Sequence, residues 1–277
     1  MHTKPILIIG ANGKTGRRIA KILSERGYSV RSGTRSAAIP FDWDDETTWA
    51  PALEGVATAY VSYFPDLAFP GAAEKIEALG ALAKEKGLER LVLLSGRGET
   101  QAERSEEIVR ACGVDYTLLR CSWFAQNFSE GYLLEPVLDG YIALPAGDVG
   151  EPIVDVDDIS DVAVAALTDM GRHSGELYEI TGPRLLRFSQ AAAELSAAIH
   201  KPVQYTPITL DQFHAAMSEI GGTFIADVFT HVCEEALDGR NEWLGDGVQR
   251  ALGRPPRDFA DFCKRAAATG VWAAKAA

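Results

Sequence analysis

The chain has 277 residues, 47% hydrophobic and 24% charged, which is enough apolar content for a globular protein with a full core. Its 39 acidic residues outnumber 27 basic ones, and the net charge of −12 argues against a nucleic-acid-binding surface. No stretch approaches the roughly 20 apolar residues of a membrane span, and an apolar run begins too near the N-terminus to leave room for a signal peptide. We therefore expect a cytoplasmic protein that binds neither membranes nor nucleic acid.

The first predicted elements are a strand, a glycine-rich turn and a helix. Ile6–Ile9 is typical of a strand buried on both faces of a parallel sheet, and Ile19, Ile22 and Leu23 recur at helical spacing. Glycines at i, i+3 and i+6 in the turn between them let the backbone approach a pyrophosphate, and the helix N-terminus offers free N–H groups. A turn without a ligand is the less favoured alternative. The residues predicted to contact a dinucleotide here are Gly10, Asn12, Gly13, Lys14, Thr15 and Gly16.

The end of the second predicted strand, Ser29–Thr34, bears on the choice of cofactor. An acidic residue there would hold the ribose 2′-hydroxyl of NAD, but this strand is followed by Arg35. A guanidinium matches a 2′-phosphate, which a carboxylate would repel. The sequence therefore predicts NADP(H) in preference to NAD(H), with a solvated surface charge as the alternative role of Arg35.

Further strands and helices alternate along the chain. Apolar runs predict strands within Val56–Tyr63 and over Leu91–Ser95 and Asp115–Arg120, and Glu74–Lys86 and Glu103–Ala111 have helical patterns. This succession predicts an α/β fold with a Rossmann-type, doubly wound parallel sheet. Ligands bind at the carboxyl ends of such strands. Residues expected there are Ser62, Tyr63, Ser95, Gly96 and Ser122, and also Asp42 and Trp43 near an adenine, at the end of a third strand. For Trp43, an apolar anchor beside a turn is the alternative.

The regular alternation ends after Arg120. Residues 122–150 are rich in proline and glycine and predict loops, followed by a helix over Val162–Met170 and a strand over Leu177–Thr181. We expect an NAD(P)-binding domain over residues 1–182 and a smaller, mostly helical lobe over 183–277, with contributions from about 122–150. The elements predicted in the lobe are helices at Ser189–Ile199, Leu210–Ile220, Phe224–Leu237 and Asp258–Ala268 and a short strand at Val203–Tyr205.

Several segments together resemble the NmrA-like group of atypical short-chain dehydrogenases/reductases. They are Gly10–Gly16, Val30–Arg35, Leu91–Ser95, Val114–Arg120 and Trp123–Phe128. Within that group, Gly13-Lys-Thr and Phe41-Asp-Trp43 look most like the ergot-alkaloid-type reductases and their bacterial relatives. The resemblance implies a Rossmann domain that binds NADP and a small lobe that closes over the substrate. The group includes NADPH-dependent quinone, imine and azo reductases, and also redox sensors that bind the cofactor without turnover.

One feature of the larger superfamily is missing. Most of its enzymes use a Tyr-x-x-x-Lys pair, in which the lysine lowers the pKa of a proton-donating tyrosine, and no tyrosine here is followed four residues later by lysine. The chain is therefore expected either to pass hydride to a quinone, imine or azo acceptor that needs little acid help, or to act as a non-catalytic redox-sensing regulator. Tyr63 is a weak candidate for the proton donor. The oligomeric state is open, and a homodimer is compatible with the sequence.

The expected substrate is a small aromatic or quinonoid molecule, because aromatic residues are frequent in the candidate pocket and lobe. Phe64, Trp123, Phe124 and Asn127 are predicted to wall the pocket, with core packing as the alternative for the aromatics. Further candidates are Phe128, Tyr132, Phe213, Phe224 and Phe229.

No metal site is predicted. Asp155, Asp157, Asp158 and Asp161 fit a helix start better than a cation site, and the four cysteines have no metal or redox spacing. Cys121 is expected to be a buried, inert thiol.

Overall fold

The protein is described by a computed structural model that covers residues 4–273. Six parallel strands form the main sheet in the order β2-β1-β3-β4-β5-β8. Their bounds are β1 Ile6–Ile9, β2 Val30–Gly33, β3 Thr58–Val61, β4 Arg90–Gly96, β5 Asp115–Cys121 and β8 Glu176–Ile180. The chain turns to opposite sides of β1 to form β2 and β3, so a ligand crevice is expected at the carboxyl ends of β1 and β3. The predicted doubly wound sheet is confirmed.

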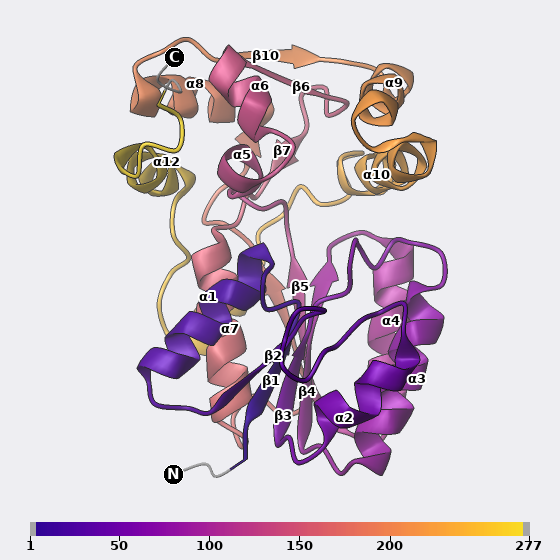
Figure 1. Ribbon diagram of the computed structural model, residues 1–277. Helices are drawn as coiled ribbons and strands as arrows, with labels where there is room; N and C mark the ends of the chain where they lie inside the picture. Colours follow the sequence, from indigo (N-terminus) through magenta and orange to yellow (C-terminus); the bar gives the residue numbers. More distant parts are fainter. Residues whose placement is uncertain (1–3, 274–277) are drawn as a thin grey trace.

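Helices cover both faces of this sheet (Figure 1). One face packs against α1 (Lys14–Glu25), α7 (Val156–Thr168) and α11 (Gly247–Leu252), and the other against α2 (Trp49–Leu53), α3 (Ala72–Glu85) and α4 (Thr100–Ala111), with a 3₁₀ turn at Glu46–Thr48. Strand β1 shows why both faces are apolar: Leu7 and Ile9 enter one core, and Ile6 and Ile8 enter the other.

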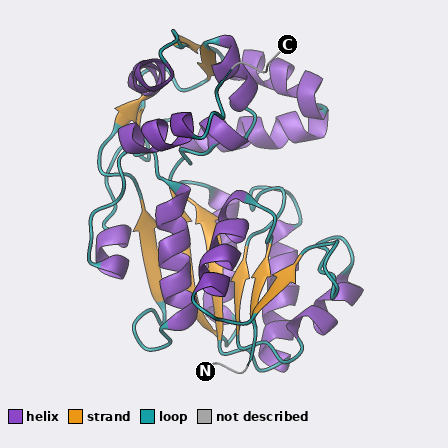
Figure 2. Cartoon of the chain, turned by 60° about the vertical axis from the view of Figure 1, so that its left-hand side comes forward, coloured by secondary structure: helices purple, strands orange, loops and turns teal. Residues whose placement is uncertain are grey.

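A second group of elements lies over the carboxyl ends of the strands (Figures 1 and 2). It has its own apolar core, to which Phe128, Phe188 and Phe259 contribute. We call this group the lobe. Its elements are α5 Asn127–Glu130, α6 Leu134–Asp139, β6 Tyr141–Leu144, β7 Gly150–Glu151, β9 Leu186–Arg187, α8 Phe188–Ile199, β10 Gln204–Pro207, α9 Leu210–Gly221, α10 Thr223–Ala236 and α12 Phe259–Ala268.

Three expectations need correction, and one helix was not predicted. The segment 122–150 is not loop alone, because it contains α5, α6, β6 and β7, and β6 pairs with the distant β10. Asp42 ends no strand of the sheet and lies in the connection after β2. Helix α7 begins at Val156 rather than Val162, because the Asp155 side chain caps it by accepting the Asp157 N–H (2.9 Å). Helix α11 was not predicted and returns from the lobe to pack on β8 and α7. Among the described residues, no helix is long and apolar enough to cross a membrane.

Candidate functional site

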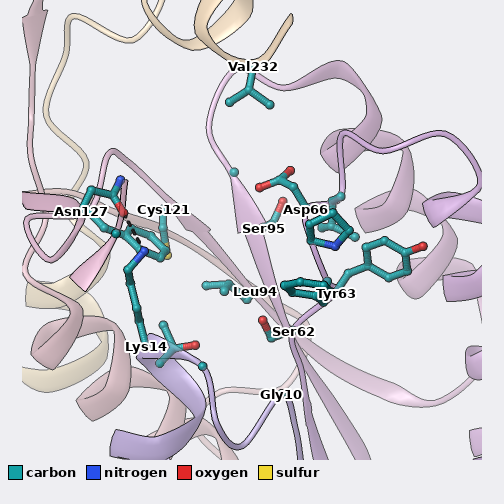
Figure 3. Close-up of a pocket in the computed structure, with 18 of the residues that line it drawn as sticks. Gly10, Lys14, Ser62, Tyr63, Asp66, Leu94, Ser95, Cys121, Asn127 and Val232 are labelled. Carbon is teal, nitrogen blue, oxygen red and sulfur yellow. Dashed lines mark hydrogen bonds between the residues drawn. The ribbon is translucent and has the colours of Figure 1, made fainter. Parts of the chain in front are cut away.

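A cavity of about 920 Å³ lies between the carboxyl ends of the central strands and the lobe (Figure 3). All the residues predicted to contact the cofactor except Gly16 line it, and so do the four residues predicted first as pocket walls. Those residues are Gly10, Asn12, Gly13, Lys14, Thr15, Arg35, Asp42, Trp43, Ser62, Tyr63, Phe64, Ser95, Gly96, Ser122, Trp123, Phe124 and Asn127. Side chains far apart in the sequence thus meet around one space, at the sheet edge where the strand order predicts a ligand.

The glycine-rich turn is shaped by close backbone contacts. Gly10 has a φ of +79°, and a Cβ there would lie 3.2 Å from the Cβ of Ser62. The Gly13 N–H donates to the Gly10 carbonyl at 2.8 Å. A Cβ on Gly16 would lie only 2.2 Å from the Gly10 carbonyl oxygen, so this residue lets α1 pack against the turn. Gly16 therefore shapes the site without lining it.

Helix α1 points its uncapped N-terminus at the cavity. No side chain caps it, and its first turn contains no acidic residue. Lys14 and Thr15 from this turn line the cavity. The Thr15 hydroxyl accepts a hydrogen bond from the Tyr60 hydroxyl (2.8 Å), which leaves the Thr15 proton available to a ligand oxygen. These are the donors that a phosphate requires.

Lys14 reaches across the cavity to the lobe. Its Nζ donates to the Asn127 side-chain oxygen at 3.0 Å (Figure 3). Burial lowers the pKa of Lys14, and the nearby Glu130 carboxylate opposes that shift. Arg17 and Arg18 both pair with Glu130, so their charges are already partly neutralised. Lys14 is therefore the cation of this turn with room for an anionic ligand.

Arg35 is exposed at the β2 end of the cavity. Within residues 4–273 its guanidinium has neither a hydrogen-bond acceptor nor an ion-pair partner. Trp43 stands between the predicted alternatives: it lines the cavity, yet it is packed against Phe41 and against Tyr63, with ring centroids 5.0 and 4.8 Å apart. Its indole N–H donates to the Ser62 carbonyl at 3.3 Å, which holds the ring beside the β3 end.

The serines at the strand ends are engaged by the protein. The Ser95 hydroxyl donates to the Glu106 carboxylate (2.6 Å), and the Ser122 hydroxyl donates to the Pro152 carbonyl (2.5 Å). Because each hydroxyl proton is used, these side chains can only accept hydrogen bonds from a ligand. A carboxamide NH₂ group would suit Ser122 in that role.

Tyr63 is poorly placed to donate a proton. Its hydroxyl points away from the middle of the cavity in Figure 3. Burial raises its pKa, and the lowering effect of Lys75 is smaller. Phe64, which is 72% exposed, lines the mouth of the cavity.

Five acidic residues that line the cavity were not predicted from the sequence: Asp44 and Glu130, which pair with cations, and Asp66, Glu99 and Glu151. Asp66 follows β3, Glu99 precedes α4 and Glu151 ends β7, and all three line the cavity. Glu151 is 2% exposed; its Oε1 accepts the Trp123 backbone N–H (3.0 Å), whereas its Oε2 has no partner. Burial raises the pKa of Glu151 to about 7. The only sequence signal was an acid shortly after a strand, which is too common to select these positions.

The aromatic candidates divide into two groups. Trp123, Phe124, Tyr132 and Phe229 line the cavity, and the indole N–H of Trp123 is buried without a partner. The remaining candidates do not line it, because Phe128 and Phe213 are in the lobe core and Phe224 is 60% exposed beside Phe69.

The acidic residues at the start of α7 have structural roles. Asp158 and Asp161 pair with Arg254 and Arg257, and Asp155 pairs with Arg265 of α12, which joins the lobe to the sheet domain. Cys121 is buried, and burial raises the pKa of its thiol well above the usual value, as expected of an unreactive cysteine.

Comparison with known proteins places the chain among reductases. No family model matches it. It is 30% identical to festuclavine synthase II of Penicillium roqueforti over 97% of this chain and 99% of the relative. An uncharacterized oxidoreductase of Bacillus subtilis is 31% identical (98% and 99% covered), and the NAD(P)H azoreductase of Xenophilus azovorans is 29% identical (95% and 98%).

Solved structures share the fold at low sequence identity. The NADPH complex of an Escherichia coli quinone oxidoreductase superposes with a TM-score of 0.75 at 22% identity, covering 94% of this chain and 99% of that one. A mutant NmrA superposes with a TM-score of 0.70 at 15% identity, covering 95% of each chain. The chain belongs to the NmrA-like atypical short-chain dehydrogenase/reductase family. This family member is an NAD(P)H-dependent oxidoreductase.

Proposed function

We propose that this NmrA-like protein uses NADPH in preference to NADH to reduce a small aromatic or quinonoid acceptor. The observation that carries the proposal is the single cavity in which the glycine turn, the unpaired Arg35 and the aromatic residues of the lobe meet. In this proposal residues 1–182 bind the cofactor, and residues 183–277, with about 122–150, enclose the acceptor.

The residues at the cofactor end fit a dinucleotide phosphate. Glycines at positions 10 and 13 leave room for a pyrophosphate, and the uncapped N-terminus of α1 and Lys14 supply donors to it. Arg35 is free to pair with a 2′-phosphate, beside Asp42 and Trp43 at the adenine. When bound, the reduced nicotinamide supplies the hydride. Ser62, Ser95, Gly96 and Ser122 at the strand ends would position it.

The acceptor end favours a flat, largely apolar molecule. Trp123, Phe124, Tyr132 and Phe229 wall it, and Phe64 stands at the mouth. A quinone, an imine or an azo compound would present a planar π-system to these rings and a heteroatom to the few polar groups. The named activities of the relatives, an azoreductase and a festuclavine synthase, are compatible with this class. A redox-sensing role like that proposed for NmrA-type proteins would not need these walls.

The test is NADPH oxidation by the purified protein with quinones, imines and azo compounds, with NADH in parallel. Acceptor-dependent oxidation that is faster with NADPH supports the proposal. Tight NADPH binding without turnover of any acceptor would reject it in favour of the sensor.

A further inference from the structure

The absent Tyr-x-x-x-Lys pair raises the question of which group supplies the proton when a neutral acceptor is reduced. Two side chains that the cofactor does not require stand out in the cavity. Asp66 comes from the loop after β3 and Glu99 from the start of α4, and both line the cavity. Figure 3 shows the Asp66 carboxyl pointing from its loop toward the middle of the cavity. We call Asp66 and Glu99 the acid pair.

The acid pair is held together by a shared hydrogen bond. The two carboxyl groups bond to each other, and Asp66 also accepts the Ala68 N–H at 2.9 Å. Two carboxyl oxygens can form such a bond only when one carboxyl carries a proton. Two carboxyl groups this close retain one proton more readily than an isolated carboxyl group does, as in other carboxyl pairs that share one site.

The backbone makes room for Glu99 at the end of β4. A Cβ on Gly96 would lie 2.1 Å from the Glu99 Oε1 and 2.5 Å from its Oε2. The carboxyl group thus lies directly against Gly96, one residue beyond Ser95. A larger residue at position 96 would displace it. This contact fixes the acid at the strand edge where the reaction is proposed to occur.

The surroundings of the pair favour its protonated form. Glu99 is 8% exposed, and its burial together with Asp66, Glu235 and Glu106 raises its pKa well above the usual value. Burial also raises the pKa of Asp66. The nearby thiols of Cys121 and Cys233 are neutral, because burial raises their pKa values as well.

Nearby cations are engaged elsewhere. Arg97 lines the same cavity but is bonded to Glu179 (2.9 Å). His231 and Arg240 lie 3.6 and 3.9 Å from Glu235. The two guanidinium groups, and the His231 ring, therefore have carboxylates of their own.

The same cavity contains two buried polar atoms that have no hydrogen-bond partner among the described residues. The Glu151 Oε2 and the Trp123 indole nitrogen are both buried and unpartnered. Leaving such atoms without partners costs free energy that a bound molecule can recover. This observation is independent of the acid pair, and it shows that this end can accommodate a ligand with its own donors and acceptors.

We propose that the Asp66–Glu99 pair is the general acid that protonates the acceptor during its reduction. The inference rests on the proposed function. An acceptor with a C=O, C=N or N=N bond gains one hydride and one proton as that π bond is reduced. The pair gives up its single proton to the acceptor's oxygen or nitrogen and becomes two carboxylates. Asp66, the more exposed partner, then regains a proton from solvent.

The experiment compares acceptors that do and do not need a proton. A neutral quinone or azo compound requires one, whereas a cationic triarylmethyl dye or an N-alkylated iminium ion becomes neutral on hydride uptake alone. The variants are Glu99→Gln and Asp66→Asn, with Glu107→Gln as the control, because Glu107 is on the same helix with its side chain 76% exposed. Steady-state rates, NADPH affinity and thermal unfolding are measured for each.

We expect Glu99→Gln to slow quinone reduction about 100-fold, within the range for loss of a general acid, with the cationic acceptor and NADPH affinity nearly unchanged. The wild-type rate with quinone should fall as pH rises above the pKa of the pair. Asp66→Asn changes a residue in a loop outside α4. It should likewise slow the reduction of quinone and leave the rate with the cationic acceptor nearly unchanged. Equal losses with both acceptors, or no loss with quinone, would overturn the acid assignment. Failure of the wild type to oxidise NADPH with any acceptor would instead reject the proposed function.

Discussion

The two ends of the cavity are built in different ways. The proposed cofactor end is built around a short stretch of chain, in which the glycine turn, Lys14 and the end of β2 supply N–H donors and positive charge, and the ends of β3, β4 and β5 complete it. The acceptor end is assembled from the loop after β3, the start of α4, β7 and the lobe, and it brings together three acids and several aromatic rings. In the two proposals above, the first end recognises an anionic cofactor and the second end protonates a neutral acceptor. The following variants test each end separately.

The largest expected effect is at the packing of the glycine turn. A Cβ at position 16 would lie 2.2 Å from the Gly10 carbonyl oxygen, which is backbone and cannot rotate away. Gly16→Ala should therefore cost about 3 kcal/mol of stability and weaken NADPH and NADH alike. Denaturant unfolding and cofactor titration measure both effects. Gly171→Ala, where the nearest atom is 3.8 Å away, is the control; an unfolding midpoint of Gly16→Ala equal to that of this control contradicts the close packing.

Glu151 should make stability depend on pH. Its pKa is raised from 4.5 to about 7, so the folded protein holds this proton more tightly than the unfolded chain. Stability is then lost as pH rises through this interval, by about 3 kcal/mol in total. Glu151→Gln has no carboxyl group to ionise, so its stability should not fall in this way. Between pH 4 and pH 8 the free energy of unfolding of this variant should rise by about 3 kcal/mol relative to that of wild type. Unfolding at both pH values tests this, with Glu107→Gln expected to follow wild type. Parallel pH curves for Glu151→Gln and wild type would count against it.

Arg35 should discriminate between the cofactors. Removing a guanidinium that pairs with a 2′-phosphate costs about 2 kcal/mol, so Arg35→Ala should raise the Kd for NADPH about 30-fold and leave that for NADH nearly unchanged. Fluorescence titration with each cofactor provides the measurement. Arg26→Ala removes an exposed arginine that does not line the cavity and serves as the control. Equal losses for NADPH and NADH would show that Arg35 does not bind the 2′-phosphate.

The smallest expected effect is at the bridge between the turn and the lobe. Asn127 accepts a hydrogen bond from Lys14 at 3.0 Å. Asn127→Ala releases the ammonium group and should weaken both cofactors to the same extent, by about 1 kcal/mol or fivefold. Isothermal titration at two salt concentrations measures the change. A preferential loss of NADPH would mean that Asn127 acts near the 2′-phosphate and not at the pyrophosphate.

Local patterns were sufficient to predict much of the sheet domain. Buried parallel strands read as continuous apolar runs, so the strands around Leu91 and Leu118 were predicted within a residue or two of their observed bounds. The spacing of Gly10, Gly13 and Gly16 likewise predicted the turn between β1 and α1. In both cases the physical cause lies in neighbouring residues.

Tertiary structure alone decided the acceptor end and part of the lobe. Strand β6 forms by pairing with β10, and two helices and three strands separate the two in the chain, so no local pattern predicts the pairing. The sequence shows Asp66, Glu99 and Glu151 as ordinary acids. Their raised pKa values arise from burial and from neighbours contributed by other elements. Because desolvation and mutual proximity exist only in the folded chain, the acid chemistry of this cavity is a property of the fold.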